Sequence, residues 1–319
     1  MNPCRNDNYN NQRRQSLNMM QISFIGLGAM GAPMAANLIT AGYQVTVFDL
    51  NPTALQTMRE RGAKIADCRH SAVAESDVIV SMLPSDAAVR DFYIGTDGVI
   101  PSLKHRPLII DCSTISAETT KQVAAVAAGL SLPIVDAPVS GGPWGAASGT
   151  LSFMVGGDAE SLDLAYPILK AMGNVIVHMG PAGSGQVAKF CNNMLAAVIM
   201  AASAEAIALG VRNGLDPSLL SDVIKNSSGG SFIINKWNPW PGVQEEAPSS
   251  NNYDGGFQLQ LMLKDLNLAL GNAEVTKSFT PLGSLCRNLY FLRSHESPES
   301  LYKDFSCVQT LFTPFPVRS

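Results

Sequence analysis

The residue in this chain whose type and position most suggest chemistry is Lys189. It lies near the start of the stretch 183–211, which opens with Gly183, Ser184 and Gly185 as a loop-to-helix transition would, and continues as a long apolar run. Asn193 follows four residues later, on the same face of a helix. Burial lowers the pKa of a lysine towards neutrality, so its amine could exchange a proton with a substrate hydroxyl. The alternative is a lysine that only extends its charge out of a core helix.

No histidine or cysteine stands in a motif that would make it an alternative acid–base group. The four histidines, at positions 70, 105, 178 and 295, stand in no motif, so an acid–base group other than histidine is expected. The six cysteines include no C-x-x-C pair and no metal-like spacing with histidine. We therefore predict no metal site, and reduced thiols in an intracellular protein.

A glycine pattern near the start of the chain predicts a dinucleotide site. Gly26-x-Gly28-x-x-Gly31 follows an apolar strand and opens a helix, and Asp49 ends the next strand. The glycines allow a tight turn and let backbone N–H groups approach a pyrophosphate, while the acid accepts hydrogen bonds from ribose hydroxyls. Its charge would repel a 2′-phosphate, so NAD is preferred over NADP. The expected cofactor contacts in this turn are Gly26, Leu27, Gly28, Ala29, Met30 and Gly31.

Two further loops follow strands that are expected to be parallel, and ligands bind at such strand ends in open α/β sheets. One contains Leu83 and Pro84, and the alternative is that the proline only ends the strand and begins a loop without a ligand. The other is the segment 111–115, where Ser113 or Thr114 could instead cap the helix that begins near Ala117.

A third loop, after the strand that ends near Asp136, contains Ser140, Gly141 and Gly142. Its exposed amides and hydroxyl favour a nest for a carboxylate or phosphate, with a plain glycine-rich connection as the alternative. Lys264 and Asp265 interrupt an otherwise amphipathic helix; they fit either a solvated face or a site.

Strand and helix signals alternate up to residue 177, and only helices follow. This alternation, with apolar strands, predicts an α/β fold of the Rossmann type: a doubly wound, mostly parallel sheet covered on both faces. An all-α C-terminal domain follows, joined by a long helix. Expected strands span residues 21–26, 44–48, 78–83, 108–111, 134–138, 152–155 and 175–178. Expected helices span 30–39, 53–61, 87–93, 117–128, 159–172, 185–210, 217–225, 259–276 and 281–292, with a loop over 235–257.

The predicted domains are a disordered leader at 1–20, an NAD-binding domain at 21–182 and a helical substrate and oligomerisation domain at 183–319. The leader is rich in Asn and Gln and is a poor match to a transit peptide. With 46% hydrophobic and 15% charged residues and a net charge of −4, the chain is globular and lacks the basic clusters that bind nucleic acid. The longest apolar run, 194–204, is too short to cross a bilayer.

Together these segments resemble the β-hydroxyacid dehydrogenase family over residues 21–312. The resemblance is carried by six motifs in family order: Gly26-Leu-Gly-Ala-Met-Gly-Ala-Pro-Met-Ala-Ala-Asn-Leu, Asp136-Ala-Pro-Val-Ser-Gly-Gly, Phe153-Met-Val-Gly-Gly, Gly185-Gln-Val-Ala-Lys-Phe-Cys-Asn-Asn-Met, Pro248-Ser-Ser-Asn-Asn-Tyr-Asp-Gly-Gly-Phe and Leu263-Lys-Asp-Leu. It implies oxidation of 3-hydroxyisobutyrate to methylmalonate semialdehyde with NAD, a step of valine breakdown. It also implies a homodimer or homotetramer, with substrate and cofactor meeting between the two domains.

The resemblance also implies residue roles. Lys189 matches the catalytic lysine, and Lys264 matches a second lysine near the nicotinamide. The residues that match substrate-binding positions are Ser140, Gly141, Gly142 and Asn193, and those that match cofactor contacts are Leu83, Pro84 and Thr114. Ala88 departs from the family, since a polar Asn often stands there, and alanine has no side-chain group to form the hydrogen bond that an Asn would make with the cofactor.

Other functions stay open. The chain could instead reduce tartronate or succinic semialdehyde, or it could be a non-catalytic NAD-sensing module. We expect a cytoplasmic protein, with the mitochondrial matrix as the alternative in a eukaryote.

Overall fold

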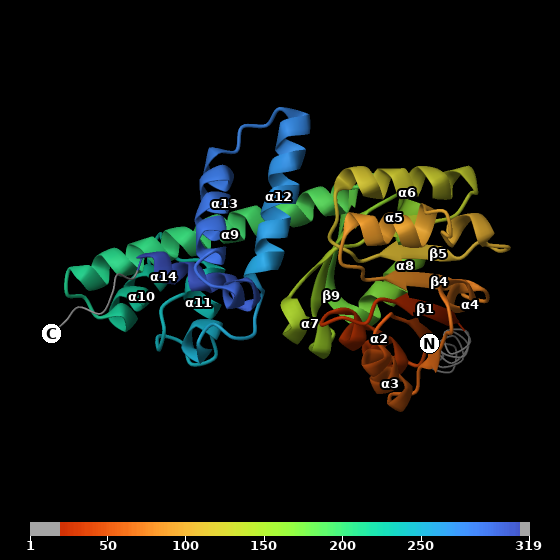
Figure 1. The fold of residues 1–319 in the computed structure, drawn as a ribbon, viewed down its shortest axis with the longest axis horizontal. Coiled ribbons are helices and arrows are strands. Elements are labelled where there is room, and N and C mark those ends of the chain that lie inside the picture. The colour runs from red at the N-terminus through yellow and green to blue at the C-terminus, as the bar shows by residue number, and fades with distance from the viewer. Residues whose placement is uncertain (1–19, 313–319) are drawn as a thin grey trace, which may run out of the picture. The chain divides into compact units, whose positions relative to one another are not determined.

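The computed structural model describes residues 20–312, and all but the last residue of the predicted leader lies outside this range. Within it the chain forms two compact units, which divide between Lys189 and Phe190 (Figure 1). This division falls inside one long helix, α9, Ser184–Arg212.

The first unit is built on one sheet of nine strands. In chain order the strands are β1 Gln21–Ile25, β2 Gln44–Phe48, β3 Lys64–Ile65, β4 Val78–Ser81, β5 Leu108–Asp111, β6 Ile134–Asp136, β7 Val139–Ser140, β8 Leu151–Gly156 and β9 Gly173–Gly180. Their spatial order is β3-β2-β1-β4-β5-β6-β8-β7, with β9 also paired to β8. The first six in this order run parallel, whereas β8 is antiparallel to β6 and β7. Strands β3 and β7 were not predicted, because two residues carry no periodic pattern.

Side chains alternate between two cores, one on each face of the sheet. In β4, Val78 and Val80 belong to the first core and Ile79 to the second. The first core is completed by α2 (Gly31–Thr40), α3 (Pro52–Glu60) and α8 (Ala159–Met172). The second is completed by α4 (Arg69–Val73), α5 (Asp86–Ile94) and α6 (Ala117–Gly129). Such two-sided burial favours apolar residues at most positions of a strand, and the predicted doubly wound fold is confirmed.

Two helices of this unit were not predicted. Helix α4 has five residues, too few for a visible period. Helix α7, Gly142–Ser148, replaces part of the glycine-rich loop that was expected after Ser140. Its composition hides it, since glycine and proline are poor helix formers. The proline at the first helical turn and Gly149, left-handed at the C-cap, nevertheless suit the two ends of a helix.

In the second unit, the described residues form helices and loops. They are α10 Pro217–Lys225, α11 Phe232–Lys236, α12 Leu259–Thr276, α13 Pro281–Ser294 and α14 Gln309–Phe312, with short 3₁₀ turns η2 Pro248–Asn251, η3 Pro298–Tyr302 and η4 Phe305–Val308. A further turn, η1 Ile100–Ser102, lies in the first unit. The predicted helical domain is confirmed, but the loop expected over 235–257 is wrong at both its start and its interior, because α11 ends at Lys236 and η2 lies within it.

Helix α9 is the core helix of the second unit. Ala197, Met200 and Ala204 are buried against α12 and α13. With 29 residues, α9 is long and apolar enough to cross a membrane by length and composition alone, a test that core helices also pass. The sequence prediction considered only its longest uninterrupted apolar run.

Candidate functional site

In the glycine turn between β1 and α2, two glycines are required by the fold and a third faces open space. Gly26 has φ +91°, and a Cβ there would lie 2.4 Å from the Met82 carbonyl oxygen. A Cβ at Gly31 would lie 1.9 Å from the Gly26 oxygen. Gly28 is exposed, and a Cβ there would meet no described atom within 4 Å. The turn is therefore tightly packed on its protein side and leaves room at Gly28 for the close approach of a ligand.

Asp49 stands beside this turn. Its carboxylate accepts hydrogen bonds from the backbone N–H of Leu27, at 2.5 Å, and of Asn51, at 2.7 Å. The side chain is only half-buried, so it can accept further hydrogen bonds from outside. The residues present therefore fit a dinucleotide: open backbone at Gly28 for the pyrophosphate and a carboxylate for a ribose.

The loops after β4 and β5 lie side by side at the same edge of the sheet. Their strands pair with Ser81 opposite Asp111, and the Leu83 N–H donates to Ser113 Oγ at 2.8 Å. Ser113 N–H in turn donates to Asp111 Oδ1 at 3.1 Å. The cap of α6 is Ser116, which accepts from Thr119 N–H, so the alternative role of Ser113 or Thr114 as its cap is wrong. Thr114, Leu83 and Pro84 thus border the edge that also carries the glycine turn.

Ser140 and the two glycines after it lie where β7 passes into α7. Gly141 and Gly142 have φ of +130° and +61°, values that favour glycine. A Cβ at Gly142 would meet no described atom within 4 Å. Gly142 therefore leaves the chain open here, as the predicted carboxylate site would need, whereas a Cβ at Gly141 would lie 3.2 Å from Leu151 Cδ2.

The start of α9 is held to the end of β6 by a buried carboxylate. Asp136 is 2% exposed and accepts from the backbone N–H of Gly183, at 2.8 Å, and of Gln186, at 3.1 Å. Burial raises the pKa of this carboxyl to about 6, although the two backbone hydrogen bonds oppose the shift. Lys189 follows Gln186 by three residues and is itself only 7% exposed. The lysine therefore stands on the turn that follows a fixed helix start.

The second unit brings together Asn193, Lys264 and a residue that the site prediction omitted. Asn193 Nδ2 donates to Asp265 Oδ2 at 2.6 Å, and Lys264 Nζ lies 3.8 Å from Asp265 Oδ1. Asp265 is 2% exposed, whereas the Lys264 side chain is 32% exposed. The carboxylate thus orients the asparagine amide and balances the charge of the lysine.

Sequence reasoning assigned no role to Asp136 and Gln186, and it left Asp265 open between a solvated helix face and a site. Asp265 had a visible signal, since an acid inside an apolar helix turn must be paired when it is buried. The other two had none, because their partners are backbone groups of distant loops.

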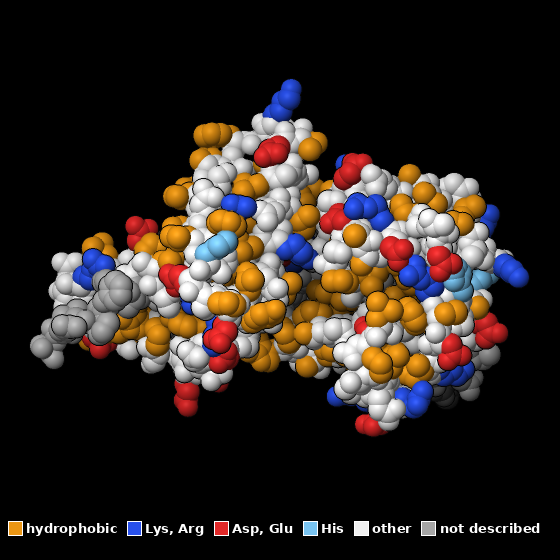
Figure 2. Space-filling view, in the orientation of Figure 1, with side chains coloured by type: hydrophobic (Ala, Val, Ile, Leu, Met, Phe, Trp, Pro, Cys, Tyr) orange, Lys and Arg blue, Asp and Glu red, His pale blue; other side chains and the backbone are white. Residues whose placement is uncertain are grey.

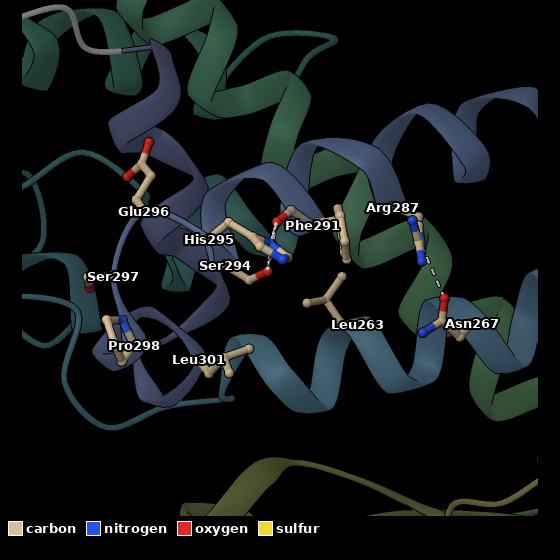
Figure 3. A pocket seen from close by; sticks show the side chains of 10 residues that line it. All are labelled: Leu263, Asn267, Arg287, Phe291, Ser294, His295, Glu296, Ser297, Pro298 and Leu301. Atoms are coloured by element: carbon tan, nitrogen blue, oxygen red, sulfur yellow. Dashed lines mark hydrogen bonds between the residues drawn. The ribbon is translucent and has the colours of Figure 1, made fainter.

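One cavity of about 590 Å³ in the second unit lies among α12, α13 and η3 (Figure 3). Arg287 donates to Asn267 Oδ1 at 3.2 Å on one side of it, and His295 contacts the Phe291 carbonyl on the other. None of the predicted site residues lines it. Among residues 20–312, no cluster of His, Cys, Asp and Glu could hold a metal ion.

Two family profiles match nearly all of this chain. The NAD binding domain of 6-phosphogluconate dehydrogenase matches residues 21–180. The profile described as the NAD-binding domain of NADP-dependent 3-hydroxyisobutyrate dehydrogenase matches residues 183–307.

Individual relatives are similar over their whole length. A 3-hydroxyisobutyrate dehydrogenase of Pseudomonas aeruginosa is 52% identical over 294 residues, 92% of this chain and 99% of that protein. An NAD-dependent L-serine dehydrogenase of the same organism is 49% identical over 296 residues, 93% of this chain and 99% of that protein. The solved 3-hydroxyisobutyrate dehydrogenase of Mycobacterium tuberculosis with L-serine is 41% identical, with a TM-score of 0.87 over 93% of this chain and all of that one.

Proposed function

This chain belongs to the 3-hydroxyisobutyrate dehydrogenase family and is an NAD-dependent oxidoreductase, and we propose that it oxidises 3-hydroxyisobutyrate to methylmalonate semialdehyde. The single observation that best supports this substrate is the 52% identity to a 3-hydroxyisobutyrate dehydrogenase along 99% of its length. The site geometry supports the reaction class: a dinucleotide turn and a buried lysine occur within one unit.

The cofactor residues are proposed on the geometry of one sheet edge. Backbone N–H groups of the turn 26–31, at the start of α2, hold the pyrophosphate. Asp49 accepts hydrogen bonds from the adenosine ribose, while Leu83, Pro84 and Thr114 border the remainder of the dinucleotide. NAD, when bound, supplies the acceptor for the hydride that leaves the substrate carbon.

Lys189 is the proposed acid–base group. As the alcohol C–H bond breaks, the amine of Lys189 accepts the hydroxyl proton, and the carbon–oxygen bond becomes a carbonyl. The burial of Lys189, which is 7% exposed, supports this role, because burial disfavours the charged form of an amine. In the reverse direction the ammonium returns the proton to the forming alkoxide.

The remaining roles concern binding. We assign the substrate carboxylate to the hydroxyl and amides of Ser140, Gly141 and Gly142. We also assign substrate binding to Asn193, and binding of both substrate and nicotinamide to Lys264, because these residues match such positions in the family. Their shared contact with Asp265 supports this grouping.

Replacing Lys189 by alanine tests the proposal. We expect NAD binding to persist while kcat falls by about 10²–10⁴-fold, the usual contribution of a general acid–base group. Lys225→Ala, which removes an exposed lysine from the last turn of α10, is the matched control. Turnover of Lys189→Ala at the level of this control would overturn the role.

L-Serine is the second candidate substrate. It has the same 3-hydroxy acid skeleton, and its dehydrogenase is 49% identical to this chain. Steady-state kinetics with 3-hydroxyisobutyrate, L-serine, D-glycerate and 4-hydroxybutyrate would separate the candidates. The proposal expects the largest kcat/KM for 3-hydroxyisobutyrate; a larger value for L-serine would reassign the substrate.

We also propose a homodimer or homotetramer, in the cytoplasm or, if the source is a eukaryote, in the mitochondrial matrix. The second unit exposes many large apolar side chains on the face that Figure 2 draws. Leu219 is 69%, Phe232 65% and Leu292 60% exposed. Large exposed apolar surface is typical of protein interfaces, and this exposure supports the proposal. Light scattering coupled to size exclusion tests the state, and a monomer at micromolar concentration would contradict it.

A further inference from the structure

We infer that Gln186 is a positioning residue whose side-chain amide fixes the Lys189 turn of α9 against the loop that follows β5. The inference rests on the role proposed for Lys189. It concerns residues of the first unit only, and it adds a residue that neither the motifs nor the proposed reaction assigned.

The amide of Gln186 is fully buried and uses both of its ends. Its Oε1 accepts from the backbone N–H of Ile115 at 3.1 Å, and its Nε2 donates to the carbonyl of Ser113 at 2.8 Å. These two backbone groups flank Thr114, the residue proposed to contact the cofactor. Among side chains of this length, glutamine offers an acceptor and a donor on one planar group.

That loop is itself held in place, so the amide contacts a fixed partner. Ser113 Oγ accepts from Leu83 N–H, and Ser113 N–H donates to Asp111. Asp111 Oδ1 also accepts from Ser81 Oγ at 2.8 Å. Gln186 therefore extends a buried network that already joins the ends of β4 and β5.

The backbone of the same helix turn is fixed separately. Asp136 accepts from the N–H of Gln186 and of Gly183. A Cβ at Gly185 would lie 2.7 Å from Asp136 Oδ2, and one at Gly156 would lie 2.4 Å from Oδ1. The two glycines come from separate motifs, and both let β6, β8 and α9 close around this carboxylate.

Backbone and side chain together leave the first turn of α9 little freedom. Lys189 follows Gln186 by three residues, so the two lie on adjacent turns of one helical face. Rotation or translation of this turn would move the lysine amine relative to the cofactor loop. A misplacement of about 1 Å can cost about 100-fold in rate.

The test replaces Gln186 by methionine, which has a similar length and no amide. We expect kcat to fall by about 10- to 100-fold. The KM for NAD should change by less than about 3-fold, because Asp49 and the glycine turn are untouched and Ser113 still holds the Thr114 loop to Leu83. Gln122→Met, on the exposed face of α6, is the matched control. A kcat equal to that of the control would overturn the inference.

A second measurement guards against a merely structural effect. The turnover of Lys189→Ala is measured with and without added methylamine, a free amine that can replace the missing side chain and that the helix does not position. If Gln186 acts through Lys189, adding Gln186→Met to Lys189→Ala changes this turnover by less than about 3-fold under both conditions. If Gln186→Met lowers turnover equally in the wild type and in Lys189→Ala, the defect is general and the inference is overturned.

The two proposals fail differently. Full activity of Lys189→Ala would remove the role of the lysine itself. An inactive Lys189→Ala together with a fully active Gln186→Met would leave that role intact and refute only the positioning by Gln186.

Discussion

The carboxylate of Asp49 offers the sharpest test of the proposed cofactor site. We predict that Asp49→Asn shifts the enzyme from NAD towards NADP. Asparagine keeps one oxygen, which can accept from Leu27 N–H as Asp49 Oδ2 does at 2.5 Å, so the glycine turn should keep its shape. The change removes the charge and, with it, only the exposed hydrogen bond from Asn51 N–H.

Two effects set the magnitude. Hydrogen bonds from ribose hydroxyls to a charged acceptor contribute about 1.5–3 kcal/mol, and Asp49→Asn loses part of this contribution to NAD binding. Like charges about 4 Å apart at a half-exposed site repel by about 1–4 kcal/mol, and Asp49→Asn removes this repulsion between the carboxylate and the 2′-phosphate of NADP. Taking about 2 kcal/mol for each effect, the ratio of kcat/KM for NAD to that for NADP should fall by about 10³-fold.

The assay is steady-state kinetics with both cofactors at saturating 3-hydroxy acid. Asp163→Asn, on the exposed face of α8, removes one negative charge away from the turn and serves as the control. Adding Leu50→Arg, at a position 89% exposed beside Asp49, should raise kcat/KM for NADP further, since arginine can pair with the 2′-phosphate. An unchanged cofactor ratio in Asp49→Asn would refute the assignment of the ribose to this carboxylate.

Three other perturbations follow from buried contacts. Gly185→Ala puts a Cβ 2.3 Å from the Met154 carbonyl oxygen, so thermal denaturation should show a loss of several °C in Tm; an unchanged Tm would contradict that contact. Asp265→Asn weakens the orientation of Asn193, and kcat/KM for the 3-hydroxy acid should fall about 10-fold; wild-type kinetics would contradict this. Burial raises the pKa of Asp304 to about 6, above its unfolded value, so this carboxyl destabilises the fold as pH rises from about 4 to 6 and remains unfavourable above. The free energy of unfolding of wild type minus that of Asp304→Asn should fall by about 2 kcal/mol between pH 4 and pH 7 in urea titrations, and a constant difference would contradict the raised pKa.

Much of the fold could be predicted from local sequence. Helices α8, α10 and α12 begin and end at the predicted residues, because the apolar period of each is local and an aspartate cap directly precedes α8 and α10. The errors fall on β3, β7, α4, α7, α11 and α14, which are too short or too rich in glycine to show a period.

The sequence by itself determined the dinucleotide turn. Glycine spacing, the following helix and an acid at the end of the next strand are all local, and the structure places Asp49 against Leu27 as this pattern requires. It also pointed to Lys189, through a charge at the start of an apolar helix and a family resemblance.

Tertiary structure alone decided which side chains fix the first turn of the lysine's helix and orient Asn193. The contacts of Asp136 with Gly183 and of Gln186 with Ser113 join residues 47 and 73 positions apart, and Asp265 reaches Asn193 across 72. Each joins a polar side chain to a group that no local pattern identifies as its partner. A buried polar group must find a hydrogen bond, but which group provides it depends on how the strands and helices pack.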